Sequence, residues 1–202
     1  MRIGGLRRRA GKYSFKAAFN GKCYRVSLSA PGKFQVGNAC VALAACARLG
    51  IAGREIEQGL ARVSPKYRFQ RISARPLLIA DCAHNPEAAQ ALSAELAGMR
   101  NGGKVLLFSA MKDKDYGEVL RVLAPHFEKM VLCEVPLARS ASLPGLFSAA
   151  RRLGRGIVLV KNPREALLRA KGLAGRNGTV VAAGSIYLLA ELFGRDKIGM
   201  AQ

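Results

Sequence analysis

The chain has 202 residues, of which 50% are hydrophobic, and its 33 Lys and Arg residues against 13 Asp and Glu give a formal net charge of +20. A chain of this length can bury roughly 70% of its unfolded surface, so it can form a core without disulfides or a structural metal. No stretch approaches the about 20 apolar residues of a membrane span, and the first residues lack the apolar stretch of a secretory signal, which predicts a cytoplasmic protein without a membrane partner.

The cysteines predict neither a disulfide framework nor a metal site. They are five in number, widely spread, and never form a C-x-x-C pair. We expect them to be reduced, apolar residues, and we expect no metal ligands in this chain. They are Cys23, Cys40, Cys46, Cys82 and Cys133.

The basic charge raises the question of a polyanionic partner, because such a balance attracts phosphates of any kind. The basic residues are scattered, and the densest run, Arg7 to Arg9, has no interleaved aromatic residues and no helix-turn-helix or zinc-finger pattern beside it. A solvated basic surface is therefore favoured over specific nucleic-acid recognition. A non-catalytic basic α/β module that binds nucleic acid or another polyanion stays open as the alternative.

The first predicted element is a β-hairpin. Residues 13–19 and 23–28 alternate between apolar and polar side chains. Asn20 and Gly21 separate these two runs, and this pair suits a tight turn with positive φ angles.

Two helices follow the hairpin and complete the first predicted segment. Apolar residues recur at helical spacing over residues 36–47, the pattern stops at Gly50, and residues 54–63 form a second, shorter helical pattern. The rhythm changes after this point. We therefore predict a boundary near Ser64-Pro65, which divides the chain into residues 1–64 and 65–202.

The rest of the chain predicts an α/β fold. From Phe69 onward, short apolar runs alternate with amphipathic helical stretches. This alternation indicates a mostly parallel, Rossmann-like sheet with helices on both faces, because each crossover helix must bury its apolar stripe on the sheet. The expected strands are residues 76–80, 104–110, 129–135, 156–161 and 178–184.

Polar residues gather where the first of these strands ends. Asp81 and His84 lie between that strand and a helical pattern that begins with Asn85 as the N-cap and Pro86 in the first turn. Open α/β sheets bind ligands outside the carboxyl ends of their strands, and a helix amino terminus there favours anions. The structural alternatives are a loop carboxylate that accepts backbone N–H groups for Asp81, and a hydrogen-bonded surface histidine for His84.

The combination of motifs resembles a known family. The segment RFQRISARPLLIADCAHNPEAAQAL, followed by SAMKDKD and GTVVAAGSIYLLAEL, resembles the carboxy-terminal part of folylpolyglutamate synthase/dihydrofolate synthase, in the Mur ligase superfamily. Upstream, APGKFQVGNACVALAACARLG is similar to the Gly-x-x-Gln-x-x-Asn-Ala segment that ends the family's central ATPase domain. The resemblance covers essentially all of the chain. It implies that residues 1–64 are a remnant of the ATPase domain and residues 65–202 the carboxy-terminal Rossmann-like domain.

The resemblance also implies roles for individual residues. It assigns the adenine of ATP to Asn38, the phosphates to Arg68 and the ribose hydroxyls to Asp81. These types suit those partners, since an amide both donates and accepts, a guanidinium forks onto phosphate, and a carboxylate accepts from a diol. His84 and Ser185 match the family's motif histidine and serine, which lie close to the incoming glutamate, and His84 is the catalytic candidate.

The implied reaction is ATP- and Mg²⁺-dependent amide bond formation. ATP phosphorylates a carboxylate of dihydropteroate or a folate, and the amine of L-glutamate attacks the acyl phosphate, with cationic clamps on the moving charge. The chain contains no G-x-x-x-x-G-K-[ST] loop. In the resemblance this loop, the metal ligands and a modified lysine all lie upstream. We therefore expect a P-loop-bearing amino-terminal half as a partner and no turnover by this chain alone.

Some positions depart from the family pattern. The family commonly has Pro-Gly just before the motif arginine, where this chain has Lys66 and Tyr67, and Lys33-Phe34 stand where a histidine often precedes the glutamine. The lysines Lys112 and Lys114 could add positive potential near a phosphate or carboxylate, but a solvated charged turn is favoured. His126 is assigned no function.

Overall fold

The computed structural model describes residues 1–9, 12–29, 32–99, 102–153 and 156–194. The chain divides into two compact units, Met1–Arg68 and Phe69–Gln202. This division lies a few residues after the boundary predicted near Ser64-Pro65.

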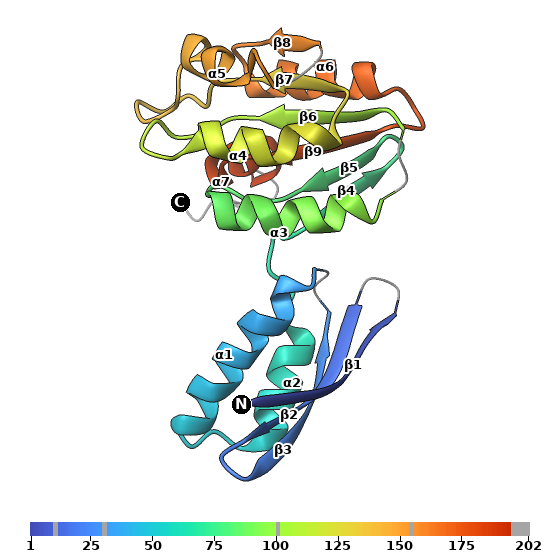
Figure 1. The fold of residues 1–202 in the computed structure, drawn as a ribbon, viewed down its shortest axis with the longest axis vertical. Coiled ribbons are helices and arrows are strands. Elements are labelled where there is room, and N and C mark those ends of the chain that lie inside the picture. The colour runs from blue at the N-terminus through green and yellow to red at the C-terminus, as the bar shows by residue number, and fades with distance from the viewer. Residues whose placement is uncertain (10–11, 30–31, 100–101, 154–155, 195–202) are drawn as a thin grey trace, which may run out of the picture. The chain divides into compact units, whose positions relative to one another are not determined.

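The first unit is a three-stranded antiparallel sheet with two helices (Figure 1). Its elements are β1 (Arg2–Arg9), β2 (Lys12–Phe19), β3 (Lys22–Leu28), α1 (Phe34–Arg48) and α2 (Gly53–Arg62). The hairpin of β2 and β3 and both helices are confirmed, and Asn20 and Gly21 turn the chain with φ angles of 50° and 73°. Strand β1 was not predicted, because its basic residues hide any apolar alternation.

Only one face of this sheet is packed. Residues Tyr13, Phe15 and Ala17 of β2 are buried, while the residues between them are exposed. The same alternation holds in β3, and the buried side chains form one cluster with Val36 and Leu43 of α1. The helices therefore cover one face of the sheet, and the alternate side chains of β2 and β3 point to solvent on the other.

The second unit is a six-stranded sheet between two layers of helices. Its strands are β4 (Gln70–Ala74), β5 (Leu77–Ala80), β6 (Lys104–Phe108), β7 (Lys129–Leu132), β8 (Ile157–Leu159) and β9 (Thr179–Ala183), in the order β4-β5-β9-β6-β7-β8. All neighbours are parallel except β4, which runs antiparallel to β5. The α/β fold with a mostly parallel sheet is confirmed. All five predicted strands are present, and the edge strand β4 is an addition.

The helices of this unit lie on both faces of the sheet. They are α3 (Pro86–Ala97), α4 (Tyr116–Leu123), α5 (Leu143–Ala150), α6 (Pro163–Ala174) and α7 (Ile186–Phe193), with a short 3₁₀ turn, η1, at Ala124–His126. Helix α4 packs against α3 and α5, and α6 packs against α7, so the two groups form separate layers (Figure 1). Asn85 Oδ1 accepts from the Ala88 N–H (2.8 Å), which confirms the predicted N-cap of α3.

The buried core of this unit runs along its central strands. All five residues of β6 and all five of β9 are buried, as expected for parallel strands covered on both faces. All five cysteines are free; Cys82 and Cys133 are buried, whereas Cys23 is exposed in β3. Burial of Cys133, with the nearby Glu134 carboxylate, raises the pKa of its thiol to about 12.

Among the described residues, no helix is both long and apolar enough to cross a membrane. Those residues also contain no group of three or more His, Cys, Asp or Glu side chains arranged to hold a metal ion.

Candidate functional site

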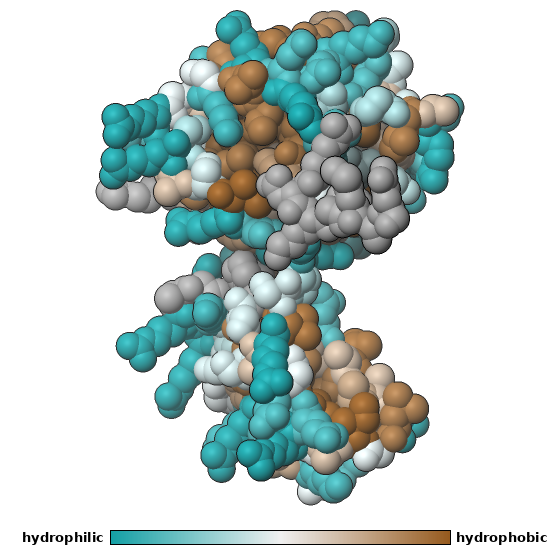
Figure 2. All heavy atoms as spheres, turned by 180° about the vertical axis from the view of Figure 1, so that it is seen from behind, coloured by the Kyte–Doolittle hydropathy of each residue, from teal (hydrophilic) through white to brown (hydrophobic). Residues whose placement is uncertain are grey.

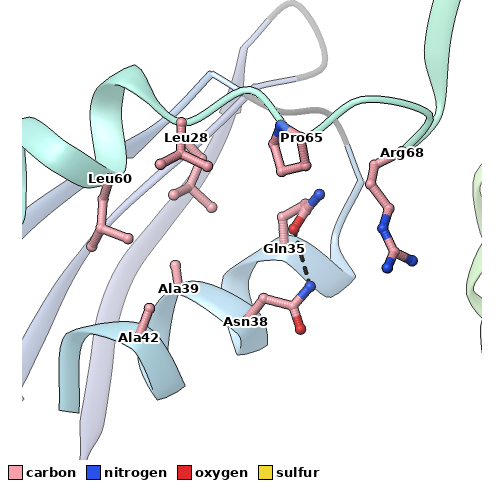
Figure 3. A pocket seen from close by; sticks show the side chains of 9 residues that line it. Leu28, Gln35, Asn38, Ala39, Ala42, Leu60, Pro65 and Arg68 are labelled. Atoms are coloured by element: carbon pink, nitrogen blue, oxygen red, sulfur yellow. Dashed lines mark hydrogen bonds between the residues drawn. The ribbon is translucent and has the colours of Figure 1, made fainter. Parts of the chain in front are cut away.

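The first unit contains a pocket that brings Asn38 and Arg68 together (Figure 3). Its volume is about 300 Å³. Asn38 lies on the exposed side of α1, and Arg68 follows the segment that leaves α2. The remaining lining residues are mostly apolar: Leu28, Gln35, Ala39, Ala42, Leu60, Val63 and Pro65. Apolar walls with a few convergent polar groups are typical of small-molecule sites, and a flat heteroaromatic base is a ligand of suitable size.

The amide of Gln35 fixes the amide of Asn38. Asn38 Nδ2 donates to Gln35 Oε1 (3.0 Å), and Figure 3 shows the Asn38 oxygen turned away from Gln35. The second Nδ2 hydrogen and the oxygen of Asn38 therefore remain for a ligand. Adenine presents a donor at N6 next to an acceptor at N7, and an asparagine amide can meet both.

Gln35 has an unusual position for a polar side chain. It is 6% exposed, and its Nε2 atom is buried without a hydrogen-bond partner among the described residues. A buried donor without a partner costs about 1–3 kcal/mol, so such a group is seldom retained without a reason. Gln35 also lines the pocket, although its Nε2 atom is itself buried.

The backbone on either side of Arg68 is strained. Tyr67 and Phe69 have φ angles of 55° and 51°, in the left-handed region that bulky residues rarely adopt. Strained backbone of this kind tends to occur where it positions a functional side chain. The left-handed φ of Tyr67 also explains why a glycine suits this position, the one that the family commonly fills with glycine.

In the second unit, Asp81 follows the carboxyl end of β5 and is 4% exposed. Its carboxylate accepts from two backbone N–H groups: that of Phe69 at Oδ2 (2.7 Å) and that of Ala83 at Oδ1 (2.8 Å). These bonds match the structural alternative, a loop carboxylate that accepts backbone N–H groups. A carboxylate has about four acceptor positions, so the two bonds do not exclude ribose hydroxyls as further donors.

His84 lies three residues beyond Asp81 and is partly buried. Its Nδ1 lies 3.0 Å from the carbonyl oxygen of Cys82. Because a carbonyl oxygen only accepts, Nδ1 carries the proton in this contact, and in the neutral ring Nε2 is left as an acceptor. The histidine is thus prepared to accept a hydrogen bond or a proton through Nε2.

Ser185 belongs to the neighbouring strand end. Its Oγ accepts from the Tyr187 N–H (3.1 Å) as the N-cap of α7, and the residue is 2% exposed. The preceding Gly184 donates its N–H to the Ala83 carbonyl (2.9 Å), so the loops that carry His84 and Ser185 adjoin. A side chain at Gly184 is impossible without rearrangement, because its Cβ would overlap the Ser109 carbonyl oxygen.

The two lysines after β6 lie on the surface. Lys112 and Lys114 are exposed, and Lys114 Nζ lies 3.5 Å from the adjacent Asp113 carboxylate. A hydrogen bond from Arg139 lowers the pKa of Asp113, so this carboxylate stays ionised and offsets the positive charge. These contacts are those of the solvated charged turn favoured from the sequence.

Two polar residues were missed by the sequence analysis. Gln35 was noted only as part of a motif, although its three-residue spacing from Asn38 on a predicted helix could have indicated their contact. Ser109 follows β6, is fully buried, and its Oγ has no hydrogen-bond partner in the part of the chain that the structure describes. Nothing in the sequence singles out Ser109, because a serine after a strand is ordinary.

Comparison with known proteins gives a consistent result. The family "Mur ligase, glutamate ligase domain" matches residues 67–186. A probable bifunctional folylpolyglutamate synthase/dihydropteroate synthase of Haloferax volcanii is 31% identical over 163 residues, which are 79% of this chain and 19% of the relative. A dihydrofolate synthase/folylpolyglutamate synthase of Mycobacterium tuberculosis is 30% identical, over 82% of this chain and 39% of the relative.

Solved structures agree with these relatives. Folylpolyglutamate synthase of Mycobacterium tuberculosis, complexed with ADP and AMPPCP, superposes with a TM-score of 0.84 and 27% identity, over 96% of this chain and 48% of that one. The chain thus spans less than half the length of these two relatives and of this solved structure. It belongs to the Mur ligase family, of which residues 67–186 form the glutamate ligase domain.

Proposed function

We propose that this chain is the carboxy-terminal portion of an ATP-dependent ligase that adds L-glutamate to dihydropteroate or a folate. The observation that carries the proposal is the pocket in which Asn38 and Arg68 meet, since the sequence motifs assign both residues to one nucleotide. The names of the relatives from Haloferax volcanii and Mycobacterium tuberculosis support glutamate and folate as substrates.

In this proposal ATP is held by three side chains. Asn38 meets the N6 and N7 edge of adenine, with its amide oriented by Gln35. Arg68 binds the phosphates, because a guanidinium presents paired N–H donors to phosphate oxygens. Asp81 accepts from the ribose hydroxyls beside its two backbone bonds. The complex of the Mycobacterium tuberculosis synthase with ADP and AMPPCP supports an adenine nucleotide as the ligand.

Glutamate is proposed to bind near His84 and Ser185. The loops that carry them adjoin through the Gly184 to Ala83 hydrogen bond, at the carboxyl ends of β5 and β9. His84 Nε2 can accept a hydrogen bond or a proton from the glutamate amine, which favours attack on the acyl phosphate. Ser185 begins α7, and its position at the amino end of a helix suits a carboxylate.

The phosphate cradle and the Mg²⁺ ligands are proposed to come from a second polypeptide segment that carries a P-loop. A surface on α1 supports such a partner. Helix α1 has Arg48 as its only charged residue, and Val41 and the adjoining Leu49 are 72% and 80% exposed. Figure 2 shows hydrophobic residues gathered on the first unit. Exposed apolar side chains that gather on one surface favour contact with a partner. We also place the ligase in the cytoplasm, where ATP is available.

A complementation assay tests the proposal. The intact chain is mixed with the separately expressed remainder of the Mycobacterium tuberculosis relative, beyond the 39% of its length that this chain covers, and glutamate-dependent phosphate release from ATP is followed with dihydropteroate or a folate present. We expect release only from the mixture, and we expect His84→Gln to reduce it strongly. A folded mixture that releases no phosphate would contradict the proposal. So would release that does not depend on this chain.

A further inference from the structure

The register of the first sheet places six cationic side chains on one face. Side chains directly opposite in an antiparallel pair point to the same face, and residues two apart along a strand share a face. Since Tyr13, Phe15 and Ala17 face the helices, the residues between them define the opposite, open face. We call this surface the open basic face. Its cations are Arg2, Arg7, Arg9, Lys12, Lys16 and Arg25.

The pairing assigns each of these residues. Arg7 pairs with Ser14, Arg9 with Lys12, and Arg2 with Ala18, all on the exposed side of β2. Arg8 provides an internal check, because it pairs with the buried Tyr13 and its guanidinium lies over that ring, 5.7 Å from the centroid. Arg8 therefore points to the covered side, as the alternation requires.

Among the described residues, no carboxylate neutralises the open basic face. Residues 1–54 contain no Asp or Glu. Glu57 of α2 touches β3, but it accepts the backbone N–H of Arg25 (2.6 Å) and not the guanidinium. None of the six cations forms an ion pair within the described ranges of the chain. Like charges at such spacing repel one another, so a bound polyanion would relieve the electrostatic repulsion within the face.

The spacing suits a chain of phosphates. Alternate residues on a strand lie about 7 Å apart and neighbouring strands about 5 Å apart, so the six cations form a grid that extends about 20 Å along β2. The other side chains of the face are small: Gly4, Ser14, Ala18, Cys23 and Ser27. A phosphodiester backbone can therefore approach the sheet closely, and the serine hydroxyls are additional donors.

The residue types on the open basic face indicate which kind of polyanion it binds. The pocket of the first unit lies on the covered side, lined by Leu28 and by residues of α1 and α2, so the open basic face is not part of the nucleotide site. The residues that the pairing assigns to it include no large apolar side chain to insert into a lipid surface, and Leu6, in the bulge between Gly4 and Arg7, has no assigned face. They also include no aromatic ring on which a base could stack, since Tyr13, Phe15 and Tyr24 are buried on the covered side.

We propose that the open basic face binds nucleic acid through its phosphate backbone, without sequence preference. This function is separate from the proposed ligase activity and does not depend on it. Because contact is with phosphates, duplex and single strand should both bind. Affinity should fall with salt as counterions return to the nucleic acid, with a slope of about −5 in log K against log[salt] for six contacts.

The test uses the intact chain and a fluorescein-labelled 20-base-pair duplex, with anisotropy measured between 50 and 300 mM KCl. The variant Arg7→Gln, Lys16→Gln, Arg25→Gln removes one cation from each strand and keeps most of each side-chain stem. We expect at least tenfold weaker binding near 100 mM salt and a slope smaller by about 3, since each lost contact removes about 0.9. Each single variant should lower the slope by about 1.

A matched control distinguishes the effect of the open basic face on binding from the effect of the total charge. The variant Arg48→Gln, Arg54→Gln, Arg62→Gln loses the same charge from exposed residues of the same unit outside this face. We expect it to keep most of the affinity, and circular dichroism must show that both variants melt like the parent chain. Equal losses in both variants would overturn the proposal. So would binding to phosphatidylserine vesicles that depends on the face while duplex binding does not.

Discussion

At the scale of single residues, Tyr67 is the position where the strain can be measured. A φ of 55° raises the conformational free energy of any residue with a Cβ, whereas glycine adopts it without steric strain. We expect Tyr67→Gly to be more stable than Tyr67→Ala by about 1 kcal/mol, because both variants lose the ring and only alanine retains the strain. The difference in the free energy of unfolding, from urea denaturation, measures this directly.

The comparison of the two variants is itself the control, since alanine is normally the more stable residue at an unstrained position. An alanine variant at least as stable as the glycine variant would show that the left-handed conformation at Tyr67 is wrong. It would also remove the physical reason for a glycine before Arg68.

Gln35 offers a second test at this scale. Gln35→Met removes the acceptor that fixes the Asn38 amide, whereas Gln35→Glu keeps an acceptor for Asn38 Nδ2. We expect Gln35→Met to weaken ADP binding by about tenfold, the loss of one oriented hydrogen bond of about 1–1.5 kcal/mol. Gln35→Glu should bind ADP more tightly than Gln35→Met. Calorimetry that finds the order reversed would refute the orienting role.

The candidate residues could be proposed from the sequence, because their motifs consist of residue types that suit nucleotide and carboxylate ligands. Their hydrogen bonds could not be predicted in this way. Asp81 was expected at a strand end, and it lies there with the two backbone N–H groups of the structural alternative. Gln35 Nε2 and Ser109 Oγ are buried without a hydrogen-bond partner among the described residues, and this depends on how neighbouring segments pack. No local pattern encodes such packing.

At the scale of elements, the junction of α3 and η1 makes stability depend on pH. Ser93 Oγ lies 2.6 Å from His126 Nε2. Burial, followed by the charge of Lys104, lowers the pKa of His126 from its usual 6.5. As the pH falls below about 6.5, the unfolded chain therefore takes up the proton first, and the folded state loses stability.

We therefore expect the free energy of unfolding to fall between pH 7 and pH 5, and to fall less in His126→Gln. The only other histidine, His84, provides the matched control as His84→Gln. Urea denaturation at several pH values measures the slopes. A slope that His126→Gln leaves unchanged, or that His84→Gln removes equally, would contradict this origin of the pH dependence.

The elements themselves were largely predictable, and the exceptions share one cause. The buried parallel strands have continuous apolar runs, and α3 has its N-cap signal at Asn85. Strands β1 and β4 were missed because none of their residues is buried, so neither shows the alternation of apolar and polar residues that marks a strand. Their pairing is determined by the neighbouring strand more than by their own sequence.

At the scale of the whole molecule, two units with different chemistry share one chain. The first has the pocket lined by Asn38 and Arg68 and the open basic face, and the second has the Mur ligase fold with Asp81, His84 and Ser185 at strand ends. The central claim is that Asn38 recognises the adenine and Asp81 the ribose of a bound adenine nucleotide. Sequence similarity supports that claim, and binding data can decide it.

The most direct measurement is calorimetry of the intact chain with ADP, 2′,3′-dideoxy-ADP and GDP. We expect the parent chain to prefer ADP over both analogues. Asp81→Asn should lose the preference over the dideoxy analogue alone, and Asn38→Ala the preference over GDP alone, because each residue contacts a different part of the nucleotide. An unchanged pattern of preferences in both folded variants, or no heat with ADP, would contradict the claim.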